Sequence, residues 1–410
     1  MAAPLPRLRP DLDMMPSPLA EQPGLLIRDP MRYSTVTLVV PPALVPGLSC
    51  FDGQKDEGDL RAALSRATGR LTTGDSARQM LDALSQAGFL DDARFAELRA
   101  TRAAALAALA ERPAAHAGSA YPDEVPALTR TLRGYFDGAP SEDGLGAGAA
   151  PFAIAAPHVS PEGGWRSYAA AYRALPADAG DRVFVVLGTS HYGIPDRYGL
   201  TRKPFATPFG NARTETALVD ALARAAPSAV SFDEPAGFVE HAVEFQVVFL
   251  QHLYGPDVRI LPVLCGAFVE GPRQRRRPEA SDAVERFVGA LGELAAREGE
   301  RLVFVLGVDF AHVGLRYGDR RAARADVGTS VDVARRDRER LARIAAGDGD
   351  GFWELVTERG EDDLKWCGTS PLYTFLRALP EARGTLRGYQ QWNIDESSIV
   401  SFGAVSFSRG

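Results

Sequence analysis

Short apolar runs alternate with helix-length amphipathic segments over the C-terminal three quarters of the chain. The runs lie at residues 152–156, 183–187, 258–264 and 302–307, and turn residues bound each of them. Uninterrupted apolar runs of this length are typical of strands that are buried on both faces of a parallel sheet. Because helix-length segments separate them, the pattern predicts repeated βαβ units.

The same pattern places the remaining elements of this region. Helices are expected at residues 163–174, 213–225, 240–253, 280–298, 319–345, 350–358 and 370–379, with a short strand at 229–232 and strands over 384–408. The segment from 188 to 212 shows no clear periodicity and is expected to be a loop. The sequence therefore predicts one large α/β domain over residues 113–410, with a mostly parallel sheet flanked by helices.

The N-terminal quarter follows a different pattern. Residues 1–24 are rich in proline and are expected to be irregular. A strand is expected at 33–40 and helices at 57–68, 76–87 and 93–110. This order suggests a small winged-helix-like module over residues 25–112, and the small residues from 112 to 119 mark the domain boundary.

Composition narrows the class of function. The net charge of −7 argues against a general nucleic-acid binder, because binding to phosphates requires a basic surface. Basic and acidic residues nearly balance in the N-terminal module, which favours docking of a peptide or protein, or packing on the next domain. No apolar run approaches the ~20 residues of a membrane span, and the first residues lack a signal-peptide core. Three cysteines are too few for a disulfide framework, so we expect a cytoplasmic protein without membrane contact.

Polar residues follow three of the predicted strands at the point where each strand ends. His158 follows the first run, His191 the second, and Asp309 and His312 the fourth. Ligands of open α/β sheets bind at the carboxyl ends of strands, so these side chains are expected at one rim. Neutral imidazoles on fixed loops can hold iron, copper or zinc. One such histidine more often satisfies a local backbone group, but the matched positions of His158 and His191 favour a site.

Two further motifs carry candidate chemistry. His241 and Glu244 lie three residues apart in the predicted helix 240–253 and would share one face. They either mark a helix start with favourable acids or point into the site as acid–base groups or partners of metal ligands. Cys367 precedes the predicted helix 370–379, whose N-terminus favours a thiolate. That thiolate is a candidate metal ligand or nucleophile.

Five short pieces of sequence, in order, resemble the Memo family, also called AmmeMemoRadiSam system protein B. They are HAGSAYP (116–122), APH (156–158), LGTSH (187–191), EHAVEFQ (240–246), and VDFAH (308–312) followed by CG (367–368). Together they span about residues 113–410. The resemblance implies a fold like that of the class III extradiol dioxygenases, with a metal-type pocket at one rim of a single α/β domain.

The resemblance also implies roles for individual residues. His158, His191 and Cys367 would be the metal ligands, and Asp309, His312, His241 and Glu244 would line the same pocket. The implied metal is iron or copper, with Fe(II) expected first and copper or zinc as alternatives, in a redox or dioxygenase-related role. The substrate would be an unknown small molecule or peptide, and a radical SAM protein is an implied partner.

The sequence departs from the family pattern in two places. After APH, residues 159–165 (VSPEGGW) stand where many members have a small–aromatic turn, so a shared substrate does not follow. The N-terminal module lies outside the core family domain and loosely resembles the peptide-binding winged-helix modules of peptide-modifying pathways. A cysteine also stands where the related dioxygenases have a carboxylate ligand, so ring cleavage does not follow automatically.

Three functional hypotheses remain open from the sequence. The first is a non-haem metal-dependent redox enzyme. The second is a metal-binding scaffold or partner protein with little turnover of its own. The third is a cysteine-dependent hydrolase that uses Cys367 with His191 or His312. An ordinary serine hydrolase is disfavoured because the chain has no Gly-x-Ser-x-Gly motif.

Overall fold

The computed structural model describes residues 3–19, 21–69, 74–139, 151–178, 180–232, 234–269 and 276–410. Contacts divide the chain into two compact units, Met1–Leu109 and Ala110–Gly410. The division falls a few residues before the boundary that the sequence suggested after residue 112. No helix of the described residues is long and apolar enough to cross a membrane.

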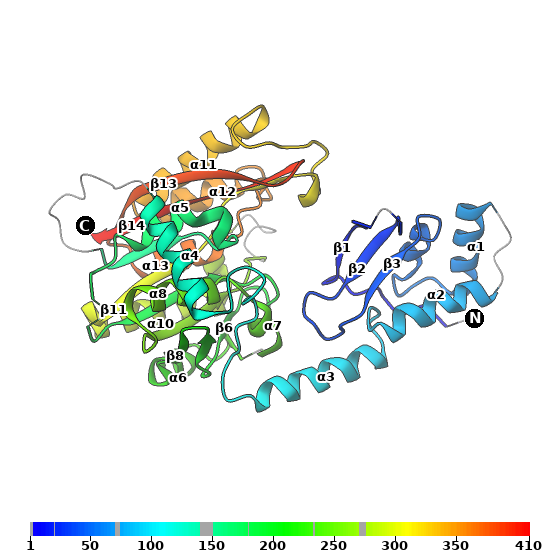
Figure 1. Ribbon diagram of the computed structural model, residues 1–410, viewed down its shortest axis with the longest axis horizontal. Helices are drawn as coiled ribbons and strands as arrows, with labels where there is room; N and C mark the ends of the chain where they lie inside the picture. Colours follow the sequence, from blue (N-terminus) through cyan, green and yellow to red (C-terminus); the bar gives the residue numbers. More distant parts are fainter. Residues whose placement is uncertain are drawn as a thin grey trace. The chain divides into compact units, whose positions relative to one another are not determined.

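The N-terminal unit combines a small antiparallel sheet with helices (Figure 1). Its elements are β1 (Asp13–Pro16), β2 (Leu25–Arg28), β3 (Thr37–Val40), η1 (Val45–Cys50), α1 (Glu57–Thr68), α2 (Gly74–Gln86) and α3 (Ala93–Ala108). The expectation that residues 1–24 are irregular was wrong at β1. That strand is formed by backbone pairing with β2, a tertiary contact that a proline-rich composition does not reveal.

A large mixed sheet flanked by helices forms the second unit. Its centre is four parallel strands in the order β4 (Ala153–Ala156), β11 (Leu302–Gly307), β5 (Val183–Thr189) and β10 (Arg259–Cys265). These are the four apolar runs of the sequence, and nearly all of their residues are buried. The predicted α/β class with a large helix-flanked sheet is therefore confirmed.

The outer strands are shorter or antiparallel. They are β6 (Tyr198–Leu200), β7 (Phe205–Thr207), β8 (Gly210–Thr214), β9 (Val230–Ser231), β12 (His312–Gly314), β13 (Ala382–Asp395) and β14 (Ser398–Arg409). The expected loop from 188 to 212 was wrong, because β6 and β7 lie within it and β8 begins there. These strands are short and partly polar, and pairing with β10 and with one another holds them in place.

Helices cover both faces of this sheet. They are α4 (Val125–Gly138), α5 (Pro161–Tyr172), α6 (Thr216–Ala225), α7 (Glu234–Val239), α8 (Glu244–Tyr254), α10 (Asp282–Glu298), α11 (Thr329–Ala345), α12 (Gly349–Thr357) and α13 (Thr369–Ala378), with short 3-10 turns η2 (Pro278–Ala280), η3 (Gly299–Arg301) and η4 (Leu315–Tyr317). Three expected starts were at least three residues too early, at residues 213, 240 and 319. The second matters for the site, because His241 lies before α8 rather than on it.

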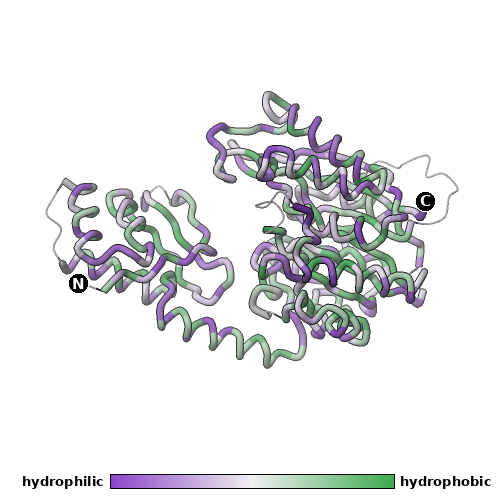
Figure 2. The backbone as a smooth tube through the Cα atoms, turned by 180° about the vertical axis from the view of Figure 1, so that it is seen from behind, coloured by the Kyte–Doolittle hydropathy of each residue, from purple (hydrophilic) through white to green (hydrophobic). Residues whose placement is uncertain are grey.

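Two apolar clusters pack on the two faces of the sheet. Phe287 and Leu291 of α10 belong to one cluster, and Tyr168 of α5 and Phe249 of α8 belong to the other. All four side chains are fully buried, and burial of each contributes roughly 1.5–3 kcal/mol. Figure 2 shows the contrast with α11, whose turns at the top are mostly hydrophilic. The packed sheet thus provides a rigid rim for the loops at the carboxyl ends of its strands.

Candidate metal centre

Three histidine rings meet at the carboxyl-end rim of the sheet. His158 follows β4, His191 follows β5, and His241 precedes α8. The ring centroids of His158 and His191 lie 5.2 Å apart, and His241 lies 5.2 Å from the first and 5.1 Å from the second. β11 lies between β4 and β5, and the pairing of Gly307 with both strands aligns their ends. The sequence-based placement of His158 and His191 at one rim agrees with this geometry.

Glycines at the strand ends allow the third histidine to approach. A Cβ atom at Gly307 would overlap the backbone oxygen of Ala242. A Cβ atom at Gly188 would lie 3.0 Å from Val243 Cγ2, which is also too close. Because both positions lack a side chain, the segment that precedes α8 can lie directly over the ends of β5 and β11. This close approach places His241 beside the other two rings.

His158 is held so that only one ring nitrogen is available. Its Nδ1 lies 2.9 Å from the backbone oxygen of Gly307, and since a carbonyl only accepts, Nδ1 carries the proton. Its backbone N–H donates to Asp309 Oδ1 at 3.0 Å. The remaining nitrogen, Nε2, lies 3.3 Å from Cys367 Sγ. His158 is 2% exposed, so this orientation is fixed inside the protein.

His191 is oriented by a buried carboxylate. Glu240 Oε1 accepts a hydrogen bond from His191 Nδ1 at 2.9 Å, and Oε2 accepts one from the His191 backbone N–H at 2.7 Å. A histidine whose Nδ1–H is held by a carboxylate presents Nε2 as a metal ligand. Glu240 lies in the EHAVEFQ motif (240–246), but no role for this residue was expected from the sequence. A glutamate directly before a candidate histidine was the available signal.

Cys367 is delivered by a loop with many internal hydrogen bonds. Asp362 accepts from the backbone N–H groups of Leu364 and Trp366 and is held in turn by Arg340. The hydroxyl of Thr189 at the end of β5 donates to the Cys367 carbonyl at 3.0 Å. This loop runs directly into α13, as the sequence predicted.

The three predicted ligands form a group with suitable spacing. His158, His191 and Cys367 each offer one ligand atom, and these atoms lie within 4.8 Å of one another. A nitrogen and a sulfur bound to one tetrahedral ion, at about 2.1 and 2.3 Å, lie about 3.6 Å apart. The 3.3 Å between His158 Nε2 and Cys367 Sγ is close to that value. The donor set therefore fits a metal ion.

Cys367 also belongs to a second group, with Asp309 and His312. Asp309 Oδ2 lies 3.6 Å from His158 Nε2. His312 Nδ1 lies 3.0 Å from the backbone oxygen of Phe310, so this nitrogen carries the proton. Cys367 therefore has a carboxylate neighbour as well as histidine neighbours.

His241 and Glu240 support the ligands rather than form a separate metal site. The ligand atoms of this group, His191, Glu240 and His241, lie within the same 4.8 Å of one another. However, Glu240 Oε1 already accepts hydrogen bonds from the His191 ring N–H and from the His241 backbone N–H. His241 Nδ1 lies 3.4 Å from that oxygen. The ring of His116, from the segment that precedes α4, lies 5.6 Å from the His241 ring. No role for His116 was expected from the sequence.

Glu244 does not join this cluster, contrary to the lining that the resemblance implied. Arg112 and the backbone N–H of Ala115 donate to its Oε2 at 2.9 and 3.0 Å. The His116 backbone and the Tyr121 hydroxyl donate to its Oε1 at 2.9 and 2.6 Å. Because α8 begins at Glu244, His241 and Glu244 do not share a helix face. Glu244 instead anchors the segment from 112 to 121.

The electrostatics of the site favour a thiolate beside a charged imidazole when no metal is bound. Burial alone would raise the pKa of Cys367, but His158 and His312 hold that pKa well below its ordinary value. Burial alone would lower the pKa of His158, but Cys367 and Asp309 raise it to about 9. Burial also raises the pKa of Asp309 and lowers that of His241. A cation at this position would replace the imidazole proton as the partner of the thiolate.

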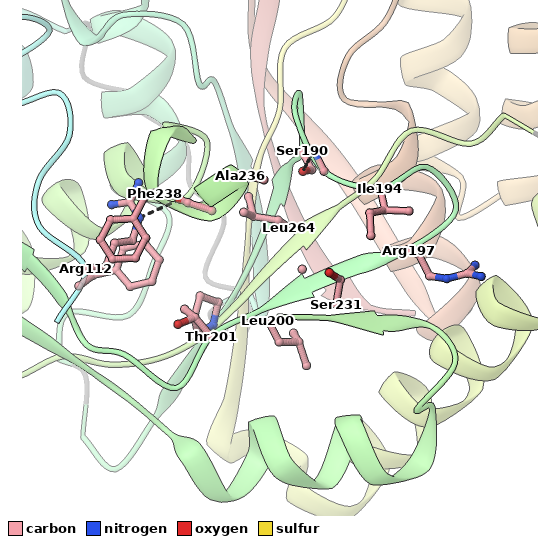
Figure 3. A pocket seen from close by; sticks show the side chains of 15 residues that line it. Arg112, Ser190, Ile194, Arg197, Leu200, Thr201, Ser231, Ala236, Phe238 and Leu264 are labelled. Carbon is pink, nitrogen blue, oxygen red and sulfur yellow. Dashed lines mark hydrogen bonds between the residues drawn. The ribbon is translucent and has the colours of Figure 1, made fainter. Parts of the chain in front are cut away.

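Two cavities have Ser190, which directly precedes His191, in their linings. The one in Figure 3 is bounded by apolar side chains such as Leu200, Phe238 and Leu264. Its cavity volume is about 40 Å³, well below the ~150 Å³ that accommodates benzene. The other cavity includes His191 and Cys367 in its wall and has a volume of about 280 Å³. Of these two cavities, only the second combines candidate ligands in its wall with enough room for a substrate group.

Comparisons with known proteins support this arrangement at the level of family. A family model described as Memo-like protein matches residues 112–406. A MEMO1 family protein from Aquifex aeolicus is 26% identical over 389 residues, which cover 93% of this chain and 95% of that protein. This match therefore includes the N-terminal unit as well.

Two other matches cover a smaller share of the chain. A MEMO1 family protein from Thermus thermophilus is 27% identical over 298 residues, covering 72% of this chain and 81% of that protein. One from Methanococcoides burtonii is 29% identical over 269 residues, covering 65% and 86%. With the family model covering most of the chain, the protein belongs to the family of Memo-like proteins.

Proposed function

We propose that the α/β unit is a metal-dependent redox enzyme whose metal ion is held by His158, His191 and Cys367. The observation that carries this proposal is the hydrogen bonding of the two Nδ1 atoms. His158 Nδ1 donates to the Gly307 carbonyl and His191 Nδ1 donates to Glu240, so each histidine can use Nε2 as a metal ligand beside the Cys367 sulfur. Membership of the Memo-like family agrees with it.

The donor set favours a borderline-soft ion. Imidazole suits iron, copper and zinc, and a thiolate shifts the preference away from magnesium and calcium. We propose Fe(II) as the native ion, with copper or zinc as alternatives. When bound, an iron or copper ion with three protein ligands would supply redox chemistry and open positions for a substrate or dioxygen, whereas zinc would supply only Lewis-acid chemistry.

Residues around the ligands would accept protons or hold the ligands in position. His312 keeps Nδ1 on the Phe310 carbonyl, so its Nε2 is the nitrogen that would accept a proton from a substrate hydroxyl. His241 is half-buried, and desolvation lowers its pKa, which keeps the imidazole neutral beside the ligands. Asp309 fixes the His158 backbone and so positions a ligand.

Metal content tests the proposal directly. Elemental analysis of anaerobically purified protein should find near-stoichiometric iron or copper in the wild type. His158→Ala, His191→Ala and Cys367→Ser should each lose it. His252→Ala is the matched control, because His252 stacks on Phe136 away from the cluster.

Two results would reject the proposal. One is a ligand variant that retains the metal at the wild-type level. The other is a metal-free wild type whose Cys367 reacts rapidly with iodoacetamide, which would favour the cysteine-dependent hydrolase instead.

A second candidate is a metal-binding partner protein with little turnover. The N-terminal unit favours it, because this unit has its own buried core that includes Ile27, Leu60 and Phe89. Such a unit is suited to docking a peptide or an enzyme, for which a radical SAM protein is one proposed partner. Metal-loaded protein that consumes no oxygen with any aromatic or peptide substrate, yet retains a partner in pull-down, would support this candidate over the first.

A further inference from the structure

The larger cavity beside the candidate ligands has a wall of aromatic rings. His191 and Cys367 lie at one part of its lining, and Phe268, Trp353 and Trp366 at another. We call this cavity the aromatic pocket. Its volume of about 280 Å³ exceeds the ~150 Å³ that is enough for benzene. A substituted single ring therefore fits.

The aromatic walls are fixed by their own packing. Trp366 stacks on Phe310 with ring centroids 4.4 Å apart and an interplanar angle of 21°. Trp353 lies 5.3 Å from Tyr373 and 6.0 Å from Phe268, the latter edge to face. Side chains held in this way are preorganised, so a ring that enters the pocket pays little to order them.

The polar groups of the wall are already satisfied by the protein. Trp353 Nε1 donates to the Arg276 carbonyl at 3.0 Å, and Trp366 Nε1 donates to Asp337 at 2.7 Å. The hydroxyls of the lining residues Thr189, Thr369 and Ser370 donate to backbone carbonyls. What these residues offer to a ligand is therefore mainly apolar contact.

The charged groups of the lining are already paired within the protein. Asp362 belongs to the wall, and both of its carboxylate oxygens accept hydrogen bonds from the buried Arg340 guanidinium. The Lys365 ammonium, at the same wall, pairs with Asp319 at 2.7 Å. A phosphate or carboxylate that entered would have to compete with Asp319 for the lysine. An uncharged group avoids this cost.

We propose that the aromatic pocket binds an uncharged aromatic ring of the substrate, with the reacting substituent facing His191 and Cys367. This inference rests on the proposed function of the site and adds the class of substrate. Aromatic pairs prefer stacked and edge-to-face contacts beyond the effect of buried area. An aromatic ring should therefore bind about three- to tenfold more tightly than a saturated ring of the same shape.

Binding of 4-fluorophenol to the full-length protein tests the inference. The ¹⁹F NMR signal is followed in titrations of metal-loaded and metal-free protein. Phenol should displace the probe at several-fold lower concentration than cyclohexanol, and phenyl phosphate should displace it poorly. Equal displacement by phenol and cyclohexanol, or stronger displacement by phenyl phosphate, would overturn the inference.

Substitutions test whether 4-fluorophenol binds in the aromatic pocket. Ala267 is exposed and belongs to the lining, so Ala267→Trp should fill the pocket and abolish binding of 4-fluorophenol without loss of metal. Val331→Trp, at a position of α11 that is 58% exposed, is the matched control and should bind the probe as the wild type does. Phe268→Ala should weaken binding several-fold.

The outcomes separate this inference from the proposed function. If no metal is found but the probe binds the wild type and not Ala267→Trp, the redox proposal fails and the aromatic pocket stands. If metal is present but the wild type and Ala267→Trp bind the probe equally, the pocket assignment fails and the metal centre stands.

Discussion

Hydrogen bonds to Nδ1 decide which nitrogen each histidine presents to the candidate centre. For His158 the acceptor is the Gly307 carbonyl, and for His191 it is Glu240. The sequence identified both histidines and Cys367, because strand ends and a helix start can be read from apolar periodicity. It missed the role of Glu240, because the direction of a side chain depends on tertiary neighbours. The shared helix face expected for His241 and Glu244 was wrong because the predicted helix began four residues too early.

Glu240 offers a test at this scale. Glu240→Gln keeps the size of the side chain but replaces one acceptor oxygen with a donor, so it cannot hold both His191 N–H groups. Loss of such a partner typically weakens metal binding by about 10- to 100-fold. Competition with a chelator should show this loss, while the exposed-site control Glu300→Gln should match the wild type. Unchanged affinity in Glu240→Gln would show that His191 is oriented by other contacts.

Glu244 makes stability depend on pH. Burial alone would raise its pKa, but Arg112 and the surrounding donors hold the pKa below the ordinary value of 4.5. A carboxylate with a lowered folded-state pKa contributes stability above its unfolded pKa, and the contribution is lost as pH falls through the folded pKa.

We therefore expect Glu244→Gln to lower the free energy of unfolding at pH 7 by about 3 kcal/mol, because it leaves the buried Arg112 charge without a partner. The difference from the wild type should shrink as pH falls below about 4. Urea unfolding across pH 3–8 measures both. A difference that stays constant over this range would contradict the assigned pKa direction.

At the scale of elements, close approach between backbones shapes the site. The segment before α8 lies over Gly188 and Gly307 without intervening side chains. The central strands β4, β5, β10 and β11 were predictable because each is a continuous apolar run. The strands β6 to β8 were not, because pairing with β10 rather than a hydrophobic pattern defines them.

Gly307→Ala tests the close approach. The added methyl group would overlap the Ala242 carbonyl, so α8 and His241 must move, and we expect a loss of about 1–3 kcal/mol in the free energy of unfolding together with weaker metal binding. Gly289→Ala is the matched control, since a Cβ atom in α10 meets nothing within 4 Å. That variant should be neutral or more stable by up to about 1 kcal/mol. Equal stability of the two variants would contradict the proposed steric role of Gly307.

At the scale of the whole molecule, the division between the two units comes just before Arg112, a residue that holds the start of the α/β unit in place. Arg112 is 2% exposed and bonds to Glu244 as well as to the backbone of Gly237. The sequence predicted the two-part organisation from the change in pattern near residue 112. It could not show that the residues after this break are an integral part of the site's support.

Two truncated chains test that dependence. A chain that begins at Ala110 retains Arg112, His116 and Tyr121, so it should fold and keep the wild-type metal content. A chain that begins at Asp123 lacks these three residues and Ala115, which together supply the four hydrogen-bond donors to Glu244, and should be strongly destabilised or insoluble. Circular dichroism and elemental analysis measure both. Equal behaviour of the two chains would show that the anchor is dispensable.

The different acceptors behind His158 and His191 have a consequence for spectroscopy. A neutral carbonyl polarises one Nδ1–H bond and a carboxylate polarises the other, so the second imidazole carries more anionic character. The two ligands are therefore electronically distinct. In ¹⁵N-histidine-labelled protein their Nδ1–H protons should resonate separately, with that of His191 further downfield, and a diamagnetic ion such as zinc would let each ligand be observed on its own.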